Sequence, residues 1–250
     1  MTLVVFDLDH TLMPIDTGDV WVRWLLAGCP AEQRKEGVRT IERFAREYRA
    51  QTLSIDEFED WQMRFLAGFD REFLEKARLD YKREVLEAVA PRESLRAARL
   101  AKSEGAVTAL CTATYRFAVE PSAEIFGLDH VLATLPEEDA SGRFTGRWVG
   151  PMTYQAGKVT AVKALVGRLA KEGIEIEAFE FWSDSAADLP LFEFVHEKGG
   201  VCHVVNANET MREKARLCGW DIGRTYTDDE EKAALSVVAK ALAKRENSSH

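Results

Sequence analysis

The sequence predicts an α/β protein whose mostly parallel sheet carries an all-helical segment inserted after the first strand. Three observations support this fold class. A short apolar run at residues 4–6 opens the chain, helical periodicities fill residues 20–89, and apolar runs alternate with helical patterns after Pro91. With 250 residues, of which 46% are hydrophobic, the chain can bury one core domain together with a smaller insertion.

The first predicted strand, Val4 to Phe6, leads directly into Asp7 and Asp9. Alternate residues of an extended chain share a face, so the two carboxylates are expected to point into the same small volume. Their repulsion would be relieved by a hard cation such as Mg²⁺, and ligand sites in open α/β sheets lie at the carboxyl ends of the strands. A pair of aspartates that only ends a strand and makes a turn is equally consistent with this feature alone.

The segment after the first strand shows apolar residues at intervals of three and four, which is typical of amphipathic helices. A capping box at residues 54–57 precedes the second of these runs. We therefore expect a helical domain over residues 16–90, inserted into a core domain formed by residues 1–15 and 91–250. The periodic sets are Val38, Ile41, Phe44 and Tyr48; Phe58, Trp61 and Phe65; and Phe73, Ala77, Tyr81, Val85 and Val89.

Beyond Pro91 the pattern changes to alternating strands and helices. Strands are predicted over residues 106–111, 179–182 and 201–205, and helices over residues 92–102, 158–171 and 189–195. This alternation predicts a parallel sheet with helices on its faces. Residues 131–149, which contain Gly142 and Gly146, are expected to form a small β excursion. Residues 228–244 are predicted to form a helix, and residues 245–250 a frayed tail.

The bulk properties favour a small-molecule partner. A net charge of −9 without a dense Lys/Arg block argues against nucleic acid or an anionic membrane surface. The chain enters its first strand at once and has no apolar run near the ~18 residues of a membrane span, so we expect a cytoplasmic protein. Widely spaced cysteines predict reduced, packed thiols rather than a zinc site or disulfides; they are Cys29, Cys111, Cys202 and Cys218.

Later strand ends supply further polar groups that a parallel sheet would bring towards the first strand's carboxylates. The Thr112 hydroxyl and the backbone N–H groups after it could bind an anion. Lys158 opens a predicted helix, which is unfavourable for the helix dipole unless an anion lies nearby. Asp184 could reach a metal while Asp188 supports it, or Asp188 could simply cap the next helix. Taken singly, Thr112 as a strand end and Lys158 as a surface residue are the simpler interpretations.

In this order, the DxDxT motif at residues 7–11, Thr112, Lys158 and the DSxxD motif at residues 184–188 resemble the haloacid dehalogenase (HAD) superfamily of phosphohydrolases over the whole chain. The resemblance is closest to subfamily IB, with its phosphoserine phosphatase-like and histidinol-phosphatase-like members. It implies a Rossmann-like (HAD-like) core with an all-helical cap domain. Such a cap would exclude water during phosphorylation, admit it afterwards and set the substrate choice.

The resemblance implies roles for the residues that match the family's motifs. Asp7 would be the nucleophile that becomes an aspartyl-phosphate, and Asp9 the general acid towards the leaving group and then the general base on water. Thr112 and Lys158 would bind the other phosphoryl oxygens, and Lys158 would also offset the charge of Asp7.

The resemblance also implies a Mg²⁺ cofactor. Its ligands would be the Asp7 and Asp184 carboxylates and the Asp9 main-chain carbonyl, with Asp188 orienting this set. His10, between the two catalytic carboxylates and Thr11, is expected to shape the loop rather than to transfer a proton.

No specificity residue can be named from the sequence. Several residues near the root of the helical segment or after Thr112 could face the pocket, although packing of the tryptophans and solvation of the charges are simpler expectations. These residues are Asp16, Asp19, Trp21, Arg23, Trp24 and Arg116.

The predicted function is a Mg²⁺-dependent phosphomonoester hydrolase that acts on a small soluble metabolite, with phosphoserine, histidinol phosphate and polyol phosphates all open. The alternatives are a phosphotransferase or mutase and a receiver-like signalling module that uses the same aspartate. The motif order and the helical insertion speak against the receiver-like module. A water-activating Asp9 favours hydrolysis over transfer.

Overall fold

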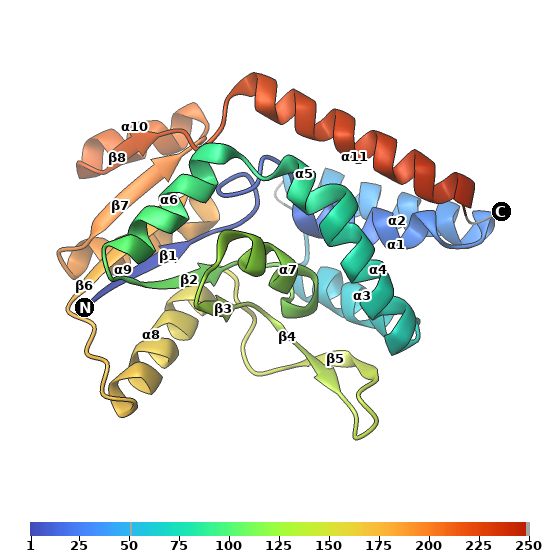
Figure 1. The fold of residues 1–250 in the computed structure, drawn as a ribbon, viewed down its shortest axis with the longest axis horizontal. Helices are drawn as coiled ribbons and strands as arrows, with labels where there is room; N and C mark the ends of the chain where they lie inside the picture. The colour runs from blue at the N-terminus through green and yellow to red at the C-terminus, as the bar shows by residue number, and fades with distance from the viewer. Residues whose placement is uncertain (51, 249–250) are drawn as a thin grey trace.

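The computed structural model describes residues 1–50 and 52–248. A six-stranded parallel sheet with the order β3-β2-β1-β6-β7-β8 forms its centre (Figure 1). This confirms the predicted α/β class and the parallel sheet. The strands are β1 (Thr2–Phe6), β2 (Val107–Cys111), β3 (His130–Leu132), β6 (Ala178–Ser183), β7 (Val201–Val205) and β8 (Asp221–Gly223).

The central strand β1 is apolar on both faces because helices cover both sides of the sheet. Leu3 and Val5 pack into one hydrophobic cluster with α8 (Ala156–Lys171), α9 (Leu189–Glu197) and α10 (Glu209–Cys218). Val4 and Phe6 point to the opposite cluster, which includes residues of α6 (Arg92–Ser103) and α7 (Arg116–Phe126). A short 3₁₀ turn, η2 (Ala186–Asp188), precedes α9.

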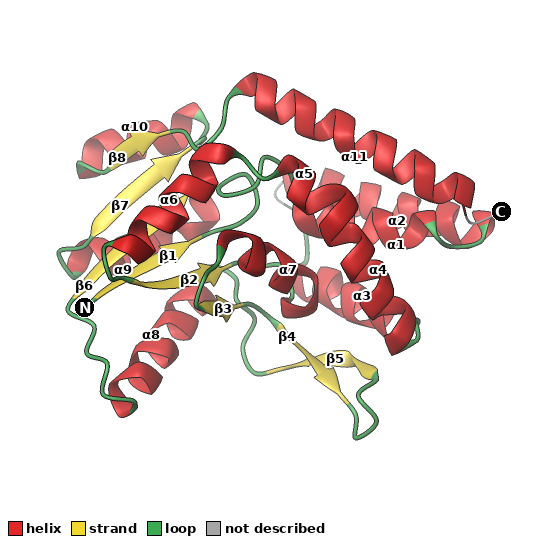
Figure 2. Cartoon of the chain, in the orientation of Figure 1, coloured by secondary structure: helices red, strands yellow, loops and turns green. Residues whose placement is uncertain are grey.

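The predicted helical segment follows β1 (Figure 2). The serine half of its capping box is present, since Ser54 Oγ accepts a hydrogen bond from the Glu57 backbone N–H at 3.3 Å. The Glu57 carboxylate instead accepts a hydrogen bond from Arg43 at 2.7 Å. The last three elements run on from one another, with a π-helical turn in the middle. The elements are α1 (Thr17–Ala27), α2 (Ala31–Arg49), α3 (Ile55–Ala67), α4 (Arg71–Tyr81), the π-helical turn η1 (Lys82–Leu86) and α5 (Glu87–Val89).

The helix α3 buries a different face from the one that its aromatic periodicity predicts. Phe58, Trp61 and Phe65 are only half-buried and form an aromatic row; Trp61 and Phe65 stack with ring centroids 5.2 Å apart. The fully buried residues are instead Glu59, Gln62, Met63 and Leu66. The helix is covered on more than one side, so a single apolar stripe does not identify its most buried face.

The expected β excursion is an antiparallel pair, β4 (Leu135–Glu138) and β5 (Phe144–Val149), which packs against α3. Gly146 of β5 has φ +83°, which glycine adopts at no steric cost. It packs on α3, where an added Cβ would be in ordinary contact with Ala67 Cβ at 3.6 Å. A segment of the predicted core domain thus reaches the inserted helices.

The C-terminal helix α11 (Asp228–Ser248) runs from the sheet to the inserted helices (Figure 1). The prediction of a frayed tail is wrong for residues 245–248, and residues 249–250 lie outside the described part of the chain. Arg245 Nε donates a hydrogen bond to the Trp24 carbonyl at 2.7 Å, and its guanidinium lies 4.4 Å from the centroid of the Trp24 ring. These tertiary contacts extend the helix beyond its local pattern.

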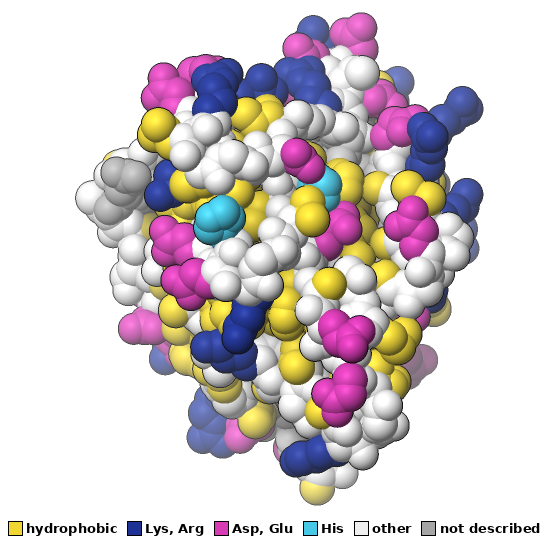
Figure 3. All heavy atoms as spheres, turned by 90° about the vertical axis from the view of Figure 1, so that its left-hand side faces the viewer, with side chains coloured by type: hydrophobic (Ala, Val, Ile, Leu, Met, Phe, Trp, Pro, Cys, Tyr) yellow, Lys and Arg dark blue, Asp and Glu magenta, His cyan; other side chains and the backbone are white. Residues whose placement is uncertain are grey.

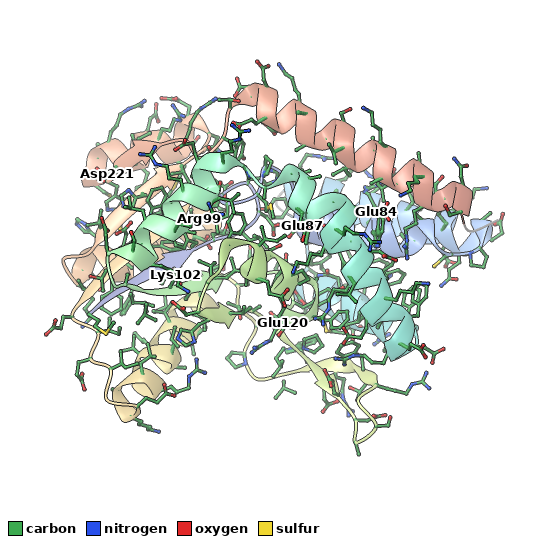
Figure 4. The ribbon with its side chains drawn as sticks, in the orientation of Figure 1. Glu84, Glu87, Arg99, Lys102, Glu120 and Asp221 are labelled. Carbon is green, nitrogen blue, oxygen red and sulfur yellow. The ribbon has the colours of Figure 1, made fainter. Side chains whose placement is uncertain are left out.

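Ion pairs and a shared hydrophobic cluster join the inserted helices to the rest of the molecule. Lys244 of α11 pairs with Glu84 at 2.6 Å, and Arg78 of α4 pairs with Glu120 of α7 at 2.8 Å; both glutamates are labelled in Figure 4. One hydrophobic cluster includes side chains from both parts. The boundaries at residues 15/16 and 90/91 fall in the connections before α1 and after α5, and the division into two domains stays a prediction.

The surface carries charges of both signs. Acidic and basic side chains are interspersed over the face that Figure 3 shows. Across residues 1–50 and 52–248, no helix has the length and apolar character needed to cross a bilayer. All four cysteines are free thiols, and three of them are buried.

Candidate active site

Three strands place their first following residues at one edge of the sheet. Asp7 follows β1, Thr112 follows β2 and Asp184 follows β6. Both neighbours pair with β1 in parallel register up to Phe6, so the three strand ends lie level. The Asp7 N–H extends the pairing with a 2.9 Å hydrogen bond to the carbonyl of Trp182. The convergence expected from a parallel sheet is therefore present.

Lys158 is a buried cation between two carboxylates. Its Nζ lies 2.8 Å from Asp7 Oδ1 and 2.8 Å from Asp188 Oδ2, and Asp188 Oδ2 also accepts a hydrogen bond from Ser183 Oγ at 2.7 Å. Burial lowers the pKa of Lys158, but the carboxylates of Asp188 and Asp7 outweigh burial and hold that pKa above its ordinary value. Lys158 therefore stays charged and faces Asp7.

A glycine allows α8 to begin where Lys158 can reach this position. A Cβ on Gly157 would lie 1.9 Å from the carbonyl oxygen of Met152, a separation that no side chain can occupy. The backbone of the preceding loop consequently packs directly on the first turn of the helix.

Asp7 and Asp184 converge on the hydroxyl of Thr11. Thr11 Oγ1 lies 3.2 Å from Asp7 Oδ2 and 3.1 Å from Asp184 Oδ1, and it accepts a hydrogen bond from the Asp184 N–H at 3.0 Å. Burial and the nearby Asp7 raise the pKa of Asp184 to about 7, although His10 opposes this. A carboxyl group whose pKa is raised by burial and by a second carboxylate nearby favours a cation between the two groups.

The residues present fit a magnesium ion. Within the described part of the chain, no group of three or more His, Cys, Asp or Glu side chains is arranged to hold a metal. The ligand set predicted here needs only the side chains of Asp7 and Asp184, together with the Asp9 main-chain carbonyl. Oxygen donors of this kind, completed by water and a substrate oxygen, suit Mg²⁺.

The Asp9 carboxylate is held from two sides. Its Oδ1 accepts hydrogen bonds from the N–H and hydroxyl of Thr17 at 2.7 and 2.6 Å, and its Oδ2 accepts one from Thr114 Oγ1 at 3.0 Å. Burial, Asp16 and Asp7 raise its pKa to about 7 against the hydrogen bonds from Thr17. Thr17 begins α1 and Thr114 lies after β2, so the inserted helices and the sheet both fix this group.

Sequence reasoning assigned no role to either threonine that holds Asp9. Thr114 belongs to the Thr112-Ala113-Thr114 sequence, whose spacing offered a signal, whereas Thr17 offered none. Thr112 itself is buried, and its Oγ1 accepts a hydrogen bond from the Thr114 N–H at 3.2 Å. Its own hydroxyl proton can therefore be donated to a ligand oxygen.

A cavity of about 390 Å³ lies above these groups, between the strand ends and the inserted helices. Asp7, Thr112 and Lys158 line one end, and residues of α2 and α3 line the other. Glu59 of α3 was missed by the sequence analysis. It is 4% exposed, burial raises its pKa to about 8, and its Oε2 has no hydrogen-bond partner. The local sequence offered no signal, because Glu59 stands in the acidic stretch Asp56-Glu57-Phe58-Glu59-Asp60.

The remaining residues near the motifs have structural positions. His10 has φ +56°, and its carbonyl accepts hydrogen bonds from Asn206 Nδ2 at 3.0 Å and the Tyr226 hydroxyl at 2.9 Å, which fits a loop-shaping role. Trp21 and Trp24 are fully buried, as the packing interpretation predicts.

The charged residues near the root of the helical segment and after Thr112 lie partly at the cavity and partly in ion pairs. Asp16 and Asp19 line the cavity. Arg23 pairs with Asp19 at 2.7 Å, and Arg116 pairs with Glu120 at 2.8 Å on α7.

Comparison with known proteins agrees with this geometry. A histidinol-phosphatase of Neisseria meningitidis serogroup C (strain 8013) is 27% identical over 226 residues, which cover 88% of this chain and 97% of that protein. A solved protein of unknown function from Bordetella pertussis Tohama I has a TM-score of 0.81 at 29% identity and covers 90% of this chain and 99% of its own.

A substrate-bound phosphoserine phosphatase has a TM-score of 0.56 at 24% identity, covering 92% of this chain and 95% of its own, and so shares the fold. The model of the haloacid dehalogenase-like hydrolase family matches residues 4–193. That match spans most of the chain and includes every motif residue discussed above. The protein therefore belongs to the haloacid dehalogenase-like hydrolases.

Proposed function

We propose that the protein is a Mg²⁺-dependent phosphomonoester hydrolase that acts on a small soluble metabolite through an aspartyl-phosphate on Asp7. The observation that supports this most directly is the buried contact of Asp7 with Lys158, beside Asp9, in the lining of the 390 Å³ cavity. A carboxylate paired with a fixed cation repels an anionic ester less than an unpaired carboxylate would.

In the proposed reaction, the Asp7 carboxylate attacks phosphorus and the ester oxygen leaves. Asp9 gives its proton to that oxygen, so the alcohol departs neutral. A water molecule then gives a proton to Asp9 and attacks phosphorus, which breaks the bond to Asp7 and releases inorganic phosphate. Asp9 returns to its protonated form, and Asp7 is again a carboxylate.

The other residues bind and orient the phosphoryl group. Lys158 and the Thr112 hydroxyl would hold oxygens that carry charge in the transition state. A Mg²⁺ ion bound by Asp7, Asp184 and the Asp9 carbonyl would neutralise part of the charge that two anions bring together. Asp188 keeps Lys158 in place through its 2.8 Å contact.

Two observations support a small phosphate ester as the substrate. The cavity volume of about 390 Å³ lies within the ~300–1,000 Å³ of small-molecule sites. The relative that matches along nearly its whole length is named a histidinol-phosphatase. Transfer of the phosphoryl group to another acceptor would use the same first step, so the test must follow the released phosphate.

The test measures phosphate release from a panel of phosphomonoesters by the wild type, Asp7→Asn and a surface control, Asp229→Asn, whose carboxylate is 96% exposed. Each is assayed with Mg²⁺ or EDTA. We expect metal-dependent release by the wild type and the control, and a loss of at least about 10³-fold in Asp7→Asn.

Substantial Mg²⁺-dependent release by pure Asp7→Asn would refute Asp7 as the nucleophile. No release by the wild type, with a phosphorylated Asp7 detectable by mass spectrometry, would indicate a transferase or a receiver-like role.

A further inference from the structure

Glu59 is a buried carboxylate that the proposed phosphoryl chemistry does not use. It lines the cavity from α3, is 4% exposed, and has an Oε2 atom without a hydrogen-bond partner. A buried carboxylate oxygen without a partner is costly, so it marks a position where a donor is missing. Burial raises the pKa of Glu59 to about 8, so an incoming cation would favour the charged form.

The lining of the cavity is acidic. Asp16 and Asp19 also belong to it, and Asp16 lies close enough to Asp9 to raise the pKa of that carboxyl group. The cations among the described lining residues are Lys158, which two carboxylates already hold, and Arg49, which is exposed. Acidic side chains therefore outnumber Lys and Arg in the lining, so the cavity favours a positive group over a carboxylate.

Aromatic and amide groups also line the cavity. Phe44, Phe58 and Trp61 line it, and the faces of such rings attract ammonium and imidazolium groups. Gln62, three residues after Glu59 on the same helix, is also buried and lines the cavity. Its amide oxygen is a second acceptor for a nitrogen-bound proton.

We propose that Glu59 is a specificity-determining residue that binds a positively charged nitrogen in the alcohol part of the substrate, so that the preferred substrates are phosphomonoesters of amino alcohols without a carboxylate. This inference rests on the proposed phosphatase function. Phosphoserine would bring its carboxylate towards the acidic groups, whereas its analogue phosphoethanolamine keeps the amine and lacks that charge.

The test compares kcat/KM for phosphoethanolamine and L-histidinol phosphate with kcat/KM for two other esters. These are 2-hydroxyethyl phosphate, whose alcohol part carries no charge, and phosphoserine. The enzymes are the wild type, Glu59→Gln and a control on the same helix, Asp60→Asn, whose carboxylate is 42% exposed. We expect the wild type to prefer phosphoethanolamine over 2-hydroxyethyl phosphate by at least about tenfold. That ratio should fall by about tenfold in Glu59→Gln and stay at the wild-type value in Asp60→Asn.

The possible outcomes separate this inference from the proposed function. If the wild type hydrolyses none of these esters and not even p-nitrophenyl phosphate, the proposed function fails. If 2-hydroxyethyl phosphate is hydrolysed and the kcat/KM ratio of phosphoethanolamine to 2-hydroxyethyl phosphate is the same in the wild type and Glu59→Gln, the inference is overturned. A wild type without preference for phosphoethanolamine over 2-hydroxyethyl phosphate overturns it as well, and this comparison does not depend on whether the variant folds.

Discussion

Replacing Glu59 by glutamine should stabilise the protein in a pH-dependent way. The pKa of Glu59 is raised from 4.5 to about 8 in the folded state because the carboxyl group is buried. Between these two values the folded protein keeps a proton that the unfolded chain has lost. The free energy of unfolding must then fall as the pH rises through this interval, and it levels off above pH 8.

The magnitude follows from the size of the pKa change. Each pKa unit corresponds to about 1.4 kcal/mol, so a difference of about 3.5 sets an upper bound of about 5 kcal/mol at pH 9. Glutamine has nearly the same shape and does not titrate. We expect the Glu59→Gln variant to resemble the wild type at pH 5 and to exceed its unfolding free energy by a few kcal/mol, about 2–5, at pH 9.

Urea unfolding of both proteins at pH 5, 6, 7, 8 and 9 measures this gap. Asp60→Asn serves as the matched control, because its exposed carboxylate should give no comparable widening. A gap between Glu59→Gln and the wild type that stays constant from pH 5 to pH 9 would refute the buried, unpartnered carboxyl group on which the reasoning depends.

Three further predictions concern the groups around Asp7. Lys158→Met leaves Asp7 and Asp188 buried without their cation, so the free energy of unfolding measured in urea should fall by about 3–5 kcal/mol. Adding Asp188→Asn should restore part of this loss. Equal stability of Lys158→Met and the wild type would contradict the buried ion pairs. In stopped-flow measurements, Asp9→Asn should give a stoichiometric burst of nitrophenolate from p-nitrophenyl phosphate, followed by slow turnover. The reason is that this leaving group needs no proton, whereas the water that attacks the aspartyl-phosphate lacks its general base. Turnover without a burst would contradict the role of Asp9 as acid in the first step and base in the second. Mg²⁺ should raise the melting temperature of the wild type because it binds the folded state, and Asp184→Asn should remove most of this increase. An increase of the same size in Asp184→Asn would exclude Asp184 as a ligand.

The convergence of Asp7, Thr112 and Asp184 could be predicted because it depends on local patterns and one topological rule. Each residue follows an apolar run, and parallel strands bring their carboxyl ends to one edge of the sheet. Lys158 could be added because a lysine at a helix N-terminus is locally unfavourable.

The groups that orient these residues could not be predicted. Thr17 and Thr114 bind Asp9 only because α1 and the loop after β2 meet above the sheet. Glu59 is buried on a side of α3 that the aromatic periodicity does not mark, because β5 packs on this helix and Phe44 of α2 contacts Phe58 and Trp61. Tertiary packing decides which face is buried, and a single sequence does not contain that information in its local pattern.

Several short or atypical elements escaped the sequence analysis for a similar reason. The edge strands β3 and β8 have three residues each, too few to show an alternation. The helix α7 contains Pro121, and α10 buries only Met211 and Ala215. Such elements form because the neighbouring strand or helix is already in place.

The C-terminal helix α11 links the sheet side of the molecule to the inserted helices. With 21 residues, α11 is about 30 Å long and ends on Trp24 and Glu84, in α1 and η1. Any movement of α1 must break the contact at Trp24 or carry α11 with it, and any movement of η1 must do the same at Glu84. The helices α2 and α3 lie outside both contacts, so they can shift without breaking either of them.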